Sequence, residues 1–188
     1  MPRVGLDADA VIACGAEILD EGGAADLSLA VVAARLGVKA PSLYKHVDGL
    51  PGLRRGVALA AKAEFEEVLG RAVRGRSGAD AVRAIAVAYR AWAREHPARY
   101  ALTVRAPAPD DPQDQAVSAA LAQVVFDVLA AYGLAGEDAV DATRFLRSSL
   151  HGFVTLETAG AFALPVDPDA SFGRMVDRLD ASLVDSGR

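Results

Sequence analysis

Apolar residues recur at helical spacing along almost the whole chain, and the alternation typical of half-buried strands is nearly absent. One clear stripe places Val82, Ile85, Tyr89, Trp92 and His96 at alternating steps of three and four residues. Alanine is frequent and runs of β-branched residues are scarce, which also favours helices. The sequence therefore predicts an all-α fold of roughly nine helices.

Caps mark the helix boundaries in the first part of the chain. Asp7 is suited to cap a first helix, and Ser28 to cap a second helix that Gly37 ends. Pro41 stands where a third helix would begin, because the missing proline N–H has no helical partner in a first turn. This third helix is expected to be barely two turns long and to reach His46.

The stretch "DGLPG" at 48–52 is interpreted as a turn between two regions of the chain. Residues 1–50 are expected to form a three-helix head, and residues 51–188 a larger helical bundle. Two further breaks are expected at 74–78 and at 106–114, the second of which is rich in Pro and Asp.

The composition limits the class of protein. Apolar residues make up 52% of the 188 residues and charged residues 24%, which suits a packed core rather than a disordered chain. The single cysteine, Cys14, excludes an internal disulfide and fits a reducing compartment. Because the chain has neither an apolar run of about 18 residues nor the layout of a secretory signal, we expect a cytoplasmic protein that does not enter a membrane.

The stretch "LAVVAARLGVKAPSLYKHV" at 29–47 packs two short helical patterns around a glycine. Two helices cross closely only where the residue at the crossing is small, as Ala33 is, and Gly37 tolerates the positive φ of a sharp turn. The residues expected to close a small core are Val32, Leu36, Val38 and Leu43. The stretch therefore predicts a helix-turn-helix whose second helix presents its outer face to the major groove of DNA.

This segment is locally basic in a chain of net charge −5. From Arg35 to His46 there are basic residues and no acidic one. The net charge argues mildly against a protein that coats nucleic acid along its whole length, but it leaves room for a local contact surface. Lys39 and Lys45 are expected to contact phosphates, and Arg3 is placed on an arm near the minor groove.

The other polar residues of this segment suit the same surface. Tyr44 and Ser42 can donate hydrogen bonds to phosphates or base edges, and Ser28 lies at a helix N-terminus, where anions are favoured. Ala40 and Pro41 are small enough to approach a thymine methyl group. The complete set of candidate DNA-contacting residues is Ser28, Lys39, Ala40, Pro41, Ser42, Tyr44, Lys45 and His46. The alternative is that such a spacing arises by chance in an alanine-rich chain.

Residues 6–47, and above all the run "LGVKAPSLYKHV", resemble the tetracycline-repressor (TetR/AcrR) family of bacterial regulators. The resemblance implies a DNA-binding head, a helical ligand-binding and dimerisation body, and DNA-backbone contacts from Tyr44 and His46. Ser28 and Lys39 match other frequent contact positions of the family. One departure is "DGLPG" at the start of the fourth helix, where relatives often have a lysine or other polar residue that contacts phosphate; Arg54 and Arg55 could replace that contact only with a suitable orientation of the fourth helix.

The body resembles the subgroup of this family that carries a Trp-His-Gly signature in its C-terminal domain. The stretch "LHGFVTLETAGAF" at 150–162 has Leu150 where that tryptophan would stand, and "YRAWAREHPARYAL" at 89–102 is similar as well. The candidate ligand-binding residues are Tyr89, Trp92, His96, Tyr100, Phe126, His151 and Phe153. The alternative is that these aromatic residues form a solid core.

The last two helices carry apolar stripes that a single chain is expected to leave partly uncovered. Two such helices and their copies would form a four-helix interface across a two-fold axis, as the family resemblance also implies. The candidate interface residues are Leu146, Leu150, Phe172, Met175, Leu179 and Leu183. The alternative is ordinary packing inside one chain.

The remaining signals point away from catalysis. The three histidines show no paired spacing of metal ligands, and the chain has no phosphate-binding glycine loop or nucleophile motif. We therefore predict no enzyme, metal or cofactor, but a homodimeric repressor released from a palindromic DNA operator by a small, largely apolar effector. The alternative is a helical small-molecule-binding protein or enzyme whose head is only structural.

Overall fold

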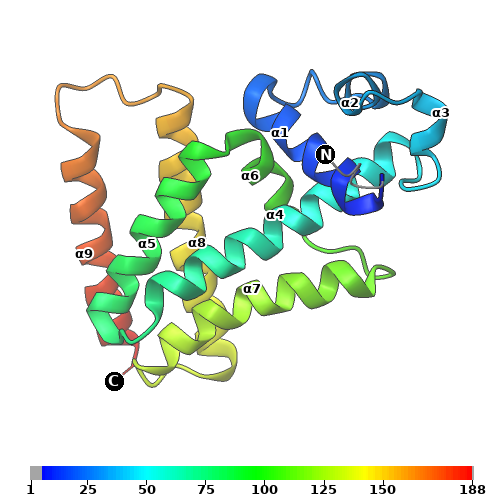
Figure 1. The fold of residues 1–188 in the computed structure, drawn as a ribbon. Helices are drawn as coiled ribbons and strands as arrows, with labels where there is room; N and C mark the ends of the chain where they lie inside the picture. Colours follow the sequence, from blue (N-terminus) through cyan, green and yellow to red (C-terminus); the bar gives the residue numbers. More distant parts are fainter. Residues whose placement is uncertain (1–5, 188) are drawn as a thin grey trace. The chain divides into compact units, whose positions relative to one another are not determined.

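A computed structural model describes residues 6–187, and every regular element among them is a helix (Figure 1). Arg3 lies outside the described residues. The described part contains nine helices, as the sequence predicted. They are α1 (Ala8–Gly22), α2 (Leu29–Leu36), α3 (Ala40–Leu43), α4 (Gly49–Val73), α5 (Gly78–Glu95), α6 (Pro97–Thr103), α7 (Pro112–Ala130), α8 (Gly136–Thr158) and α9 (Pro168–Ser186).

The chain divides into two compact units. The first consists of residues 1–64 and 95–115, and the second of residues 65–94 and 116–188. Helix α4 contributes residues to both units. The sequence analysis placed the boundary between the head and the helical bundle between residues 50 and 51, and that boundary stays a prediction.

The caps predicted for the first two helices are confirmed. The Asp7 carboxylate accepts a hydrogen bond from the Ala10 N–H at 2.8 Å, and the Ser28 hydroxyl accepts one from the Val31 N–H at 3.2 Å. Gly37 has a φ of 67°, the left-handed conformation that glycine adopts without strain. These three residues fix where α1 and α2 begin and where the turn into α3 lies.

The first unit has its own core, in which α1 packs closely against α4. A Cβ atom added at Gly15 would lie 3.0 Å from Leu53 Cδ1 and 3.1 Å from Val57 Cγ2, so the small residue is what lets the two helices approach. The buried apolar residues of this core are Val11, Cys14, Ile18, Leu19, Leu27, Val32, Ala33, Leu43, Val47, Leu53 and Val57. They hold α2 and α3 in place.

Two predicted boundaries were wrong. Helix α3 ends at Leu43 instead of His46, and the next three residues form a tight turn in which the His46 N–H donates to the Leu43 carbonyl at 2.9 Å. The stretch at 48–52 is not a free turn, because α4 begins at Gly49. Pro51 lies in the first turn of α4, where its missing N–H costs no helical hydrogen bond.

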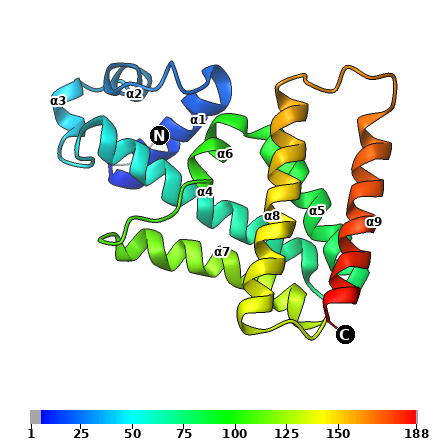
Figure 2. The same cartoon turned by 180° about the vertical axis from the view of Figure 1, so that it is seen from behind.

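In the second unit, α8 and α9 lie side by side and run antiparallel, joined by the loop at 159–167 (Figures 1 and 2). Their inward faces carry the most deeply buried side chains of the pair, among them Leu150, Val154 and Leu183. Among residues 6–187, no helix combines the length and the apolar character that crossing a membrane would require.

Candidate nucleic-acid interface

The turn around α3 presents a small set of exposed side chains above two buried anchors. Leu43 is fully buried and Val47 nearly so, whereas the Tyr44 side chain between them is 63% exposed. Lys39, which precedes α3, and Lys45, which follows it, are also exposed. Because the anchors fix the backbone, the exposed residues project into solvent from a defined position.

The other predicted contact residues lie around this turn and are less exposed. Ser28, Ala40, Ser42 and His46 are half-buried, whereas Pro41 is exposed. The Ser42 hydroxyl donates to the Lys39 carbonyl at 2.7 Å, which uses its proton inside the turn. The Ser28 hydroxyl accepts the capping hydrogen bond, so its own proton is still available to an incoming acceptor.

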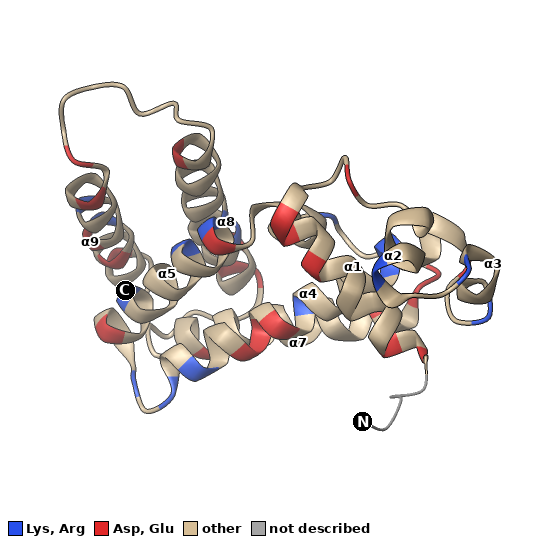
Figure 3. Cartoon of the chain, turned by 45° about the horizontal axis from the view of Figure 1, so that its top comes forward, with Lys and Arg blue, Asp and Glu red and all other residues tan. Residues whose placement is uncertain are grey.

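The positive charge of this segment is carried by the two lysines rather than by Arg35. Arg35 forms a two-point ion pair with Glu21 of α1, at 2.9 and 2.5 Å, and this hydrogen bonding lowers the pKa of Glu21. Within residues 6–187, neither Lys39 nor Lys45 has an ion-pair partner. Figure 3 shows blue segments, which mark Lys and Arg, on the chain around α2 and α3. The Glu21 contact was missed because nothing in the local sequence pairs residues on different helices.

The start of α4 holds a second ion pair that sequence reasoning did not find. The Arg55 guanidinium donates to both Asp111 carboxylate oxygens, at 2.6 and 2.7 Å, and to the Gln113 side chain at 3.1 Å. These hydrogen bonds, with one from the Asp114 N–H, lower the pKa of Asp111 to about 2. Arg55 is therefore occupied inside the unit, and Arg54 is the remaining exposed arginine that could replace the missing lysine contact.

The seven candidate ligand-binding residues fall into both units. Tyr89 and Trp92 are buried in the second unit, where the Phe65 ring lies edge-on to Tyr89 at 5.1 Å and stacks on Trp92 at 4.6 Å. This packing favours the alternative reading of the pair as core aromatics. Phe126 and His151 are half-buried in the same unit.

Phe153, another of the seven candidate ligand-binding residues, belongs to an aromatic cluster that is covered by the Arg90 side chain. Its ring lies 4.8 Å from that of Phe162 and 5.1 Å from that of Phe172. The Arg90 guanidinium lies over the Phe172 ring at 4.7 Å and also bonds to the Glu157 carboxylate, which raises the pKa of Arg90. The cluster therefore connects α5, both long helices of the pair and the loop between them.

His96 and Tyr100 belong to the first unit, where His96 is part of a polar cluster. The His96 ring nitrogen Nδ1 lies 2.9 Å from Asp20 Oδ2 and 2.7 Å from Arg99 Nη2. Arg99 is only 8% exposed; burial lowers its pKa, but hydrogen bonds to Asp20 at 3.0 Å and Glu64 at 2.5 Å outweigh that effect. The cluster fastens α6 to α1 and α4, a connection that sequence spacing alone does not reveal.

The expectation that one chain leaves the stripes of α8 and α9 uncovered was wrong. Five of the six candidate interface residues, Leu146, Leu150, Phe172, Leu179 and Leu183, are at most 4% exposed within a single chain, because they pack between the two helices and the rest of the unit. Met175 alone is half-buried. The outer face of the pair is formed instead by neighbouring residues such as Phe145, which is 47% exposed.

Sequence comparison places these features among known proteins. Residues 82–179 match the family model described as "Tetracyclin repressor-like, C-terminal domain". An HTH-type transcriptional regulator of Mycobacterium tuberculosis is 40% identical over 179 residues, which are 95% of this chain and 82% of the relative. The HTH-type transcriptional regulator YobS of Bacillus subtilis is 34% identical over 162 residues, 86% of this chain and 84% of YobS. The Trp-His-Gly subgroup stays a prediction.

Solved structures share the fold. A protein from Rhodococcus sp. RHA1 superposes with a TM-score of 0.81 at 24% identity and covers 97% of both chains. A TetR variant from Acinetobacter baumannii, crystallised in complex with minocycline, superposes with a TM-score of 0.71 at 25% identity and covers 94% of this chain and 96% of its own. Both match nearly the whole chain, so the fold as a whole is one already known from solved structures.

Proposed function

Because this chain belongs to the tetracycline-repressor family of helix-turn-helix transcriptional regulators, we propose that it is a homodimeric repressor that a small, largely apolar effector releases from operator DNA. Regulators of this family bind DNA and small-molecule effectors and dimerise; the repressor role, the apolar effector and the cytoplasmic location are our proposals. The observation that carries the proposal is the α3 turn, with buried Leu43 and Val47 beneath exposed Tyr44, Lys39 and Lys45.

Each head would place α3 and its following turn in the major groove. Lys39 and Lys45 would neutralise phosphates, while Tyr44 would donate a hydrogen bond to the DNA backbone. A two-fold dimer would present two such turns to successive major grooves about 34–36 Å apart, which favours a palindromic operator. In this proposal, residues 1–50 form the DNA-binding domain and residues 51–188 form the ligand-binding and dimerisation domain.

The effector would act by stabilising a spacing of the two heads that no longer fits the operator. It can do so only if it binds that state more tightly than the DNA-bound state. The minocycline complex of the Acinetobacter baumannii relative supports a body that holds a ring-containing molecule. Within the first unit, the Asp20–Arg99–Glu64 cluster would transmit a displacement of α6 to α1, because Arg99 is buried and bonded to both carboxylates.

Fluorescence anisotropy with DNA tests the core of the proposal. The protein is titrated onto DNA that flanks its own gene and onto a shuffled sequence of the same length, at the same salt concentration. We expect the flanking DNA to bind at least roughly a thousandfold more tightly. Equal affinity for both, or no binding to either at low salt, would contradict a DNA-binding regulator and favour a small-molecule-binding body with a structural head.

A reporter assay tests the sign of regulation and the class of effector. Expression of the protein should lower transcription from its own flanking promoter, and an apolar-solvent extract of the host cells should restore it. Raised transcription would show an activator, and release by the aqueous fraction alone would contradict an apolar effector.

A further inference from the structure

The first unit holds the guanidinium of Arg55 in a contact that another anion can replace. The Arg55 side chain is 48% exposed, yet it donates to both oxygens of the Asp111 carboxylate, at 2.6 and 2.7 Å. A phosphate offers an arginine the same two-point geometry as a carboxylate does. Any phosphate that reaches Arg55 therefore competes directly with Asp111.

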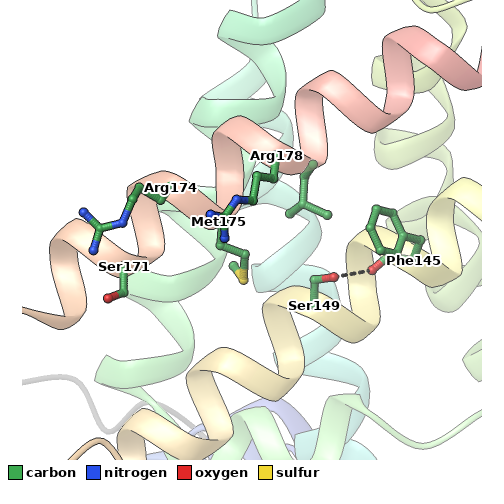
Figure 4. Close-up of a pocket in the computed structure, with 7 residues that line it drawn as sticks. Phe145, Ser149, Ser171, Arg174, Met175 and Arg178 are labelled. Carbon is green, nitrogen blue, oxygen red and sulfur yellow. Dashed lines mark hydrogen bonds between the residues drawn. The ribbon is translucent and has the colours of Figure 1, made fainter. Parts of the chain in front are cut away.

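Arg55 lies near the part of the head that would meet DNA. Helix α4 begins at Gly49, shortly after Lys45, and Arg55 follows about 9 Å further along the helix. In Figures 1 and 2, α3, the start of α4 and the loop before α7 lie at the same end of the first unit. By contrast, Arg174 and Arg178 line a hollow between α8 and α9 in the second unit (Figure 4). Of these three arginines, only Arg55 belongs to the unit that contains α3.

The loop that carries Asp111 has a second and firmer attachment to α4. Asp114, in the first turn of α7, lies 2.5 Å from Lys62 Nζ, and the same ammonium donates to the Arg105 carbonyl at 3.3 Å. Lys62 is only 3% exposed, so breaking its pair costs much more than breaking the far more exposed pair of Arg55. The loop therefore stays attached through Lys62 when Arg55 leaves.

Asp111 also keeps its position without Arg55. Its carboxylate accepts a hydrogen bond from the Asp114 N–H at 3.0 Å, as an N-cap does, because Asp111 immediately precedes α7. The pKa of Asp111 is about 2, so the carboxylate is charged at neutral pH. Protonation therefore does not open the contact at neutral pH, and a competing anion is needed to do so.

We propose that Arg55 is a further DNA-contacting residue, and that a DNA phosphate replaces the Asp111 carboxylate on its guanidinium when the head binds DNA. The proposal rests on the regulator function proposed above and adds a contact to it. The phosphate contact is gained at the loss of the Arg55–Asp111 pair, and the Asp111 charge then lies uncompensated beside the DNA. Asp111 therefore lowers the affinity for DNA of every sequence, because phosphate contacts carry no sequence information.

A double-mutant cycle on DNA binding tests the exchange. Fluorescence anisotropy with the flanking DNA and the shuffled sequence gives the affinity at several salt concentrations. Asp111→Asn should tighten binding to both DNAs at least roughly threefold, because Arg55 then leaves no charged partner. Asparagine caps helices as well as aspartate does, so the first turn of α7 is kept.

The arginine is tested in the same titrations. Arg55→Ala should weaken binding to both DNAs and reduce the slope of log K against log salt by about 0.9, the value for one phosphate contact. Arg55→Lys should keep the slope, because lysine contacts a phosphate as a point charge. This rescue separates a contact with DNA from a merely structural role of the side chain.

Two matched controls isolate the exchange from general effects of charge. Asp110 is exposed, adjoins Asp111 and does not bond to Arg55, so Asp110→Asn gives the effect of removing a nearby negative charge. In Arg55→Ala combined with Asp111→Asn, the tightening relative to Arg55→Ala alone should fall to that level. Arg71, paired with Glu67 about 24 Å further along α4, is the arginine control, and Arg71→Ala should leave the slope unchanged.

Two results would overturn the proposal. An unchanged slope in Arg55→Ala would show that Arg55 does not reach DNA, and equal effects of Asp111→Asn and Asp110→Asn would show that no competition exists. The two aspartate variants decide the second point even if Arg55→Ala lowers the stability of the fold. Either result in a protein that binds its flanking DNA specifically leaves the regulator function intact. Binding of neither DNA by the unmodified protein would instead overturn that function, and this contact with it.

Discussion

At the scale of single residues, the candidate DNA surface depends on a division between anchors and contacts. Leu43 and Val47 are buried in the core of the first unit, whereas Lys39, Tyr44 and Lys45 are exposed. The exposed residues therefore add little to the stability of the fold. Their substitution should change DNA binding and leave folding intact.

The two lysines give the first prediction. Lys39→Ala and Lys45→Ala should each weaken binding to all DNA sequences and should reduce the slope of log K against log salt by about 0.9, the value for one lost phosphate contact. Anisotropy titrations across a range of salt concentrations measure the slope. Arg76→Ala, in the exposed segment between α4 and α5, serves as a control and should leave it unchanged. An unaltered slope in both lysine variants would remove these residues from the contact surface.

Two glycines give the second prediction, because the same substitution should have opposite effects. Gly37 has a φ of 67°, so Gly37→Ala forces a left-handed alanine and should lower the free energy of unfolding by about 1–2 kcal/mol. Gly152 lies inside α8 with open space around its missing Cβ, so Gly152→Ala should raise that free energy by about 0.5–1 kcal/mol. Urea denaturation measures both. A loss of stability in Gly152→Ala would show that the site does not tolerate a Cβ.

At the scale of helices, the sequence predicted those features that depend on neighbouring residues. The caps Asp7 and Ser28 and the Gly37 turn follow from local chemistry, and all three were correct. The end of α3 at Leu43 was not predicted because the next residue, Tyr44, does not break helices. The start of α4 at Gly49 was not predicted because Pro51 was interpreted as part of a turn, although proline is tolerated in the first turn of a helix.

Contacts between distant helices were beyond what spacing can predict. The periodicity of α8 and α9 correctly identified their apolar stripes, but it could not tell whether the covering surface lies in the same chain or in another. Two ion pairs, Arg55 with Asp111 and Arg99 with Asp20, join residues that are more than 50 positions apart in the sequence. No local sequence pattern predicts such pairs. In the candidate site, the positions of the residues in one short turn could be predicted from the local sequence, whereas DNA contact by these residues and ligand binding by the seven body residues both stay predictions.

The ion pair between α4 and the segment before α7 gives the third prediction. The folded pKa of Asp111, about 2, lies below its ordinary value, so the pair stabilises the fold above about pH 4. That contribution is lost as the pH falls through about 2. In Arg55→Ala, a carboxyl-carbon NMR titration should show the Asp111 pKa rising towards its ordinary value. Arg54→Ala should leave it unchanged, and a low pKa that persists in Arg55→Ala would assign the effect to the Asp114 N–H.

At the scale of the whole molecule, neither compact unit is a continuous stretch of chain. The first unit is completed by residues 95–115, and residues 65–94 of the second lie between its two parts. Helix α4 supplies residues to both units. The first unit therefore cannot be completed before residues 65–94 of the second have been made, and the second is completed last, by residues 116–188.

This interleaving gives the fourth prediction. Trp92, the single tryptophan, is buried in the second unit, so its fluorescence reports on that unit, whereas far-UV circular dichroism reports on the helices of both. Because the units share α4 and neither is continuous, urea unfolding should give the same midpoint by both probes. Two separate midpoints would show that one unit unfolds without the other.

The construction of the α3 turn also affects how such proteins diverge. Four of the eight candidate DNA-contacting residues, Lys39, Pro41, Tyr44 and Lys45, are exposed, while the packing that holds them uses Leu43, Val47 and the other buried residues of the first unit. After gene duplication, a lineage can therefore acquire a new target sequence through a few surface exchanges, without passing through unstable intermediates.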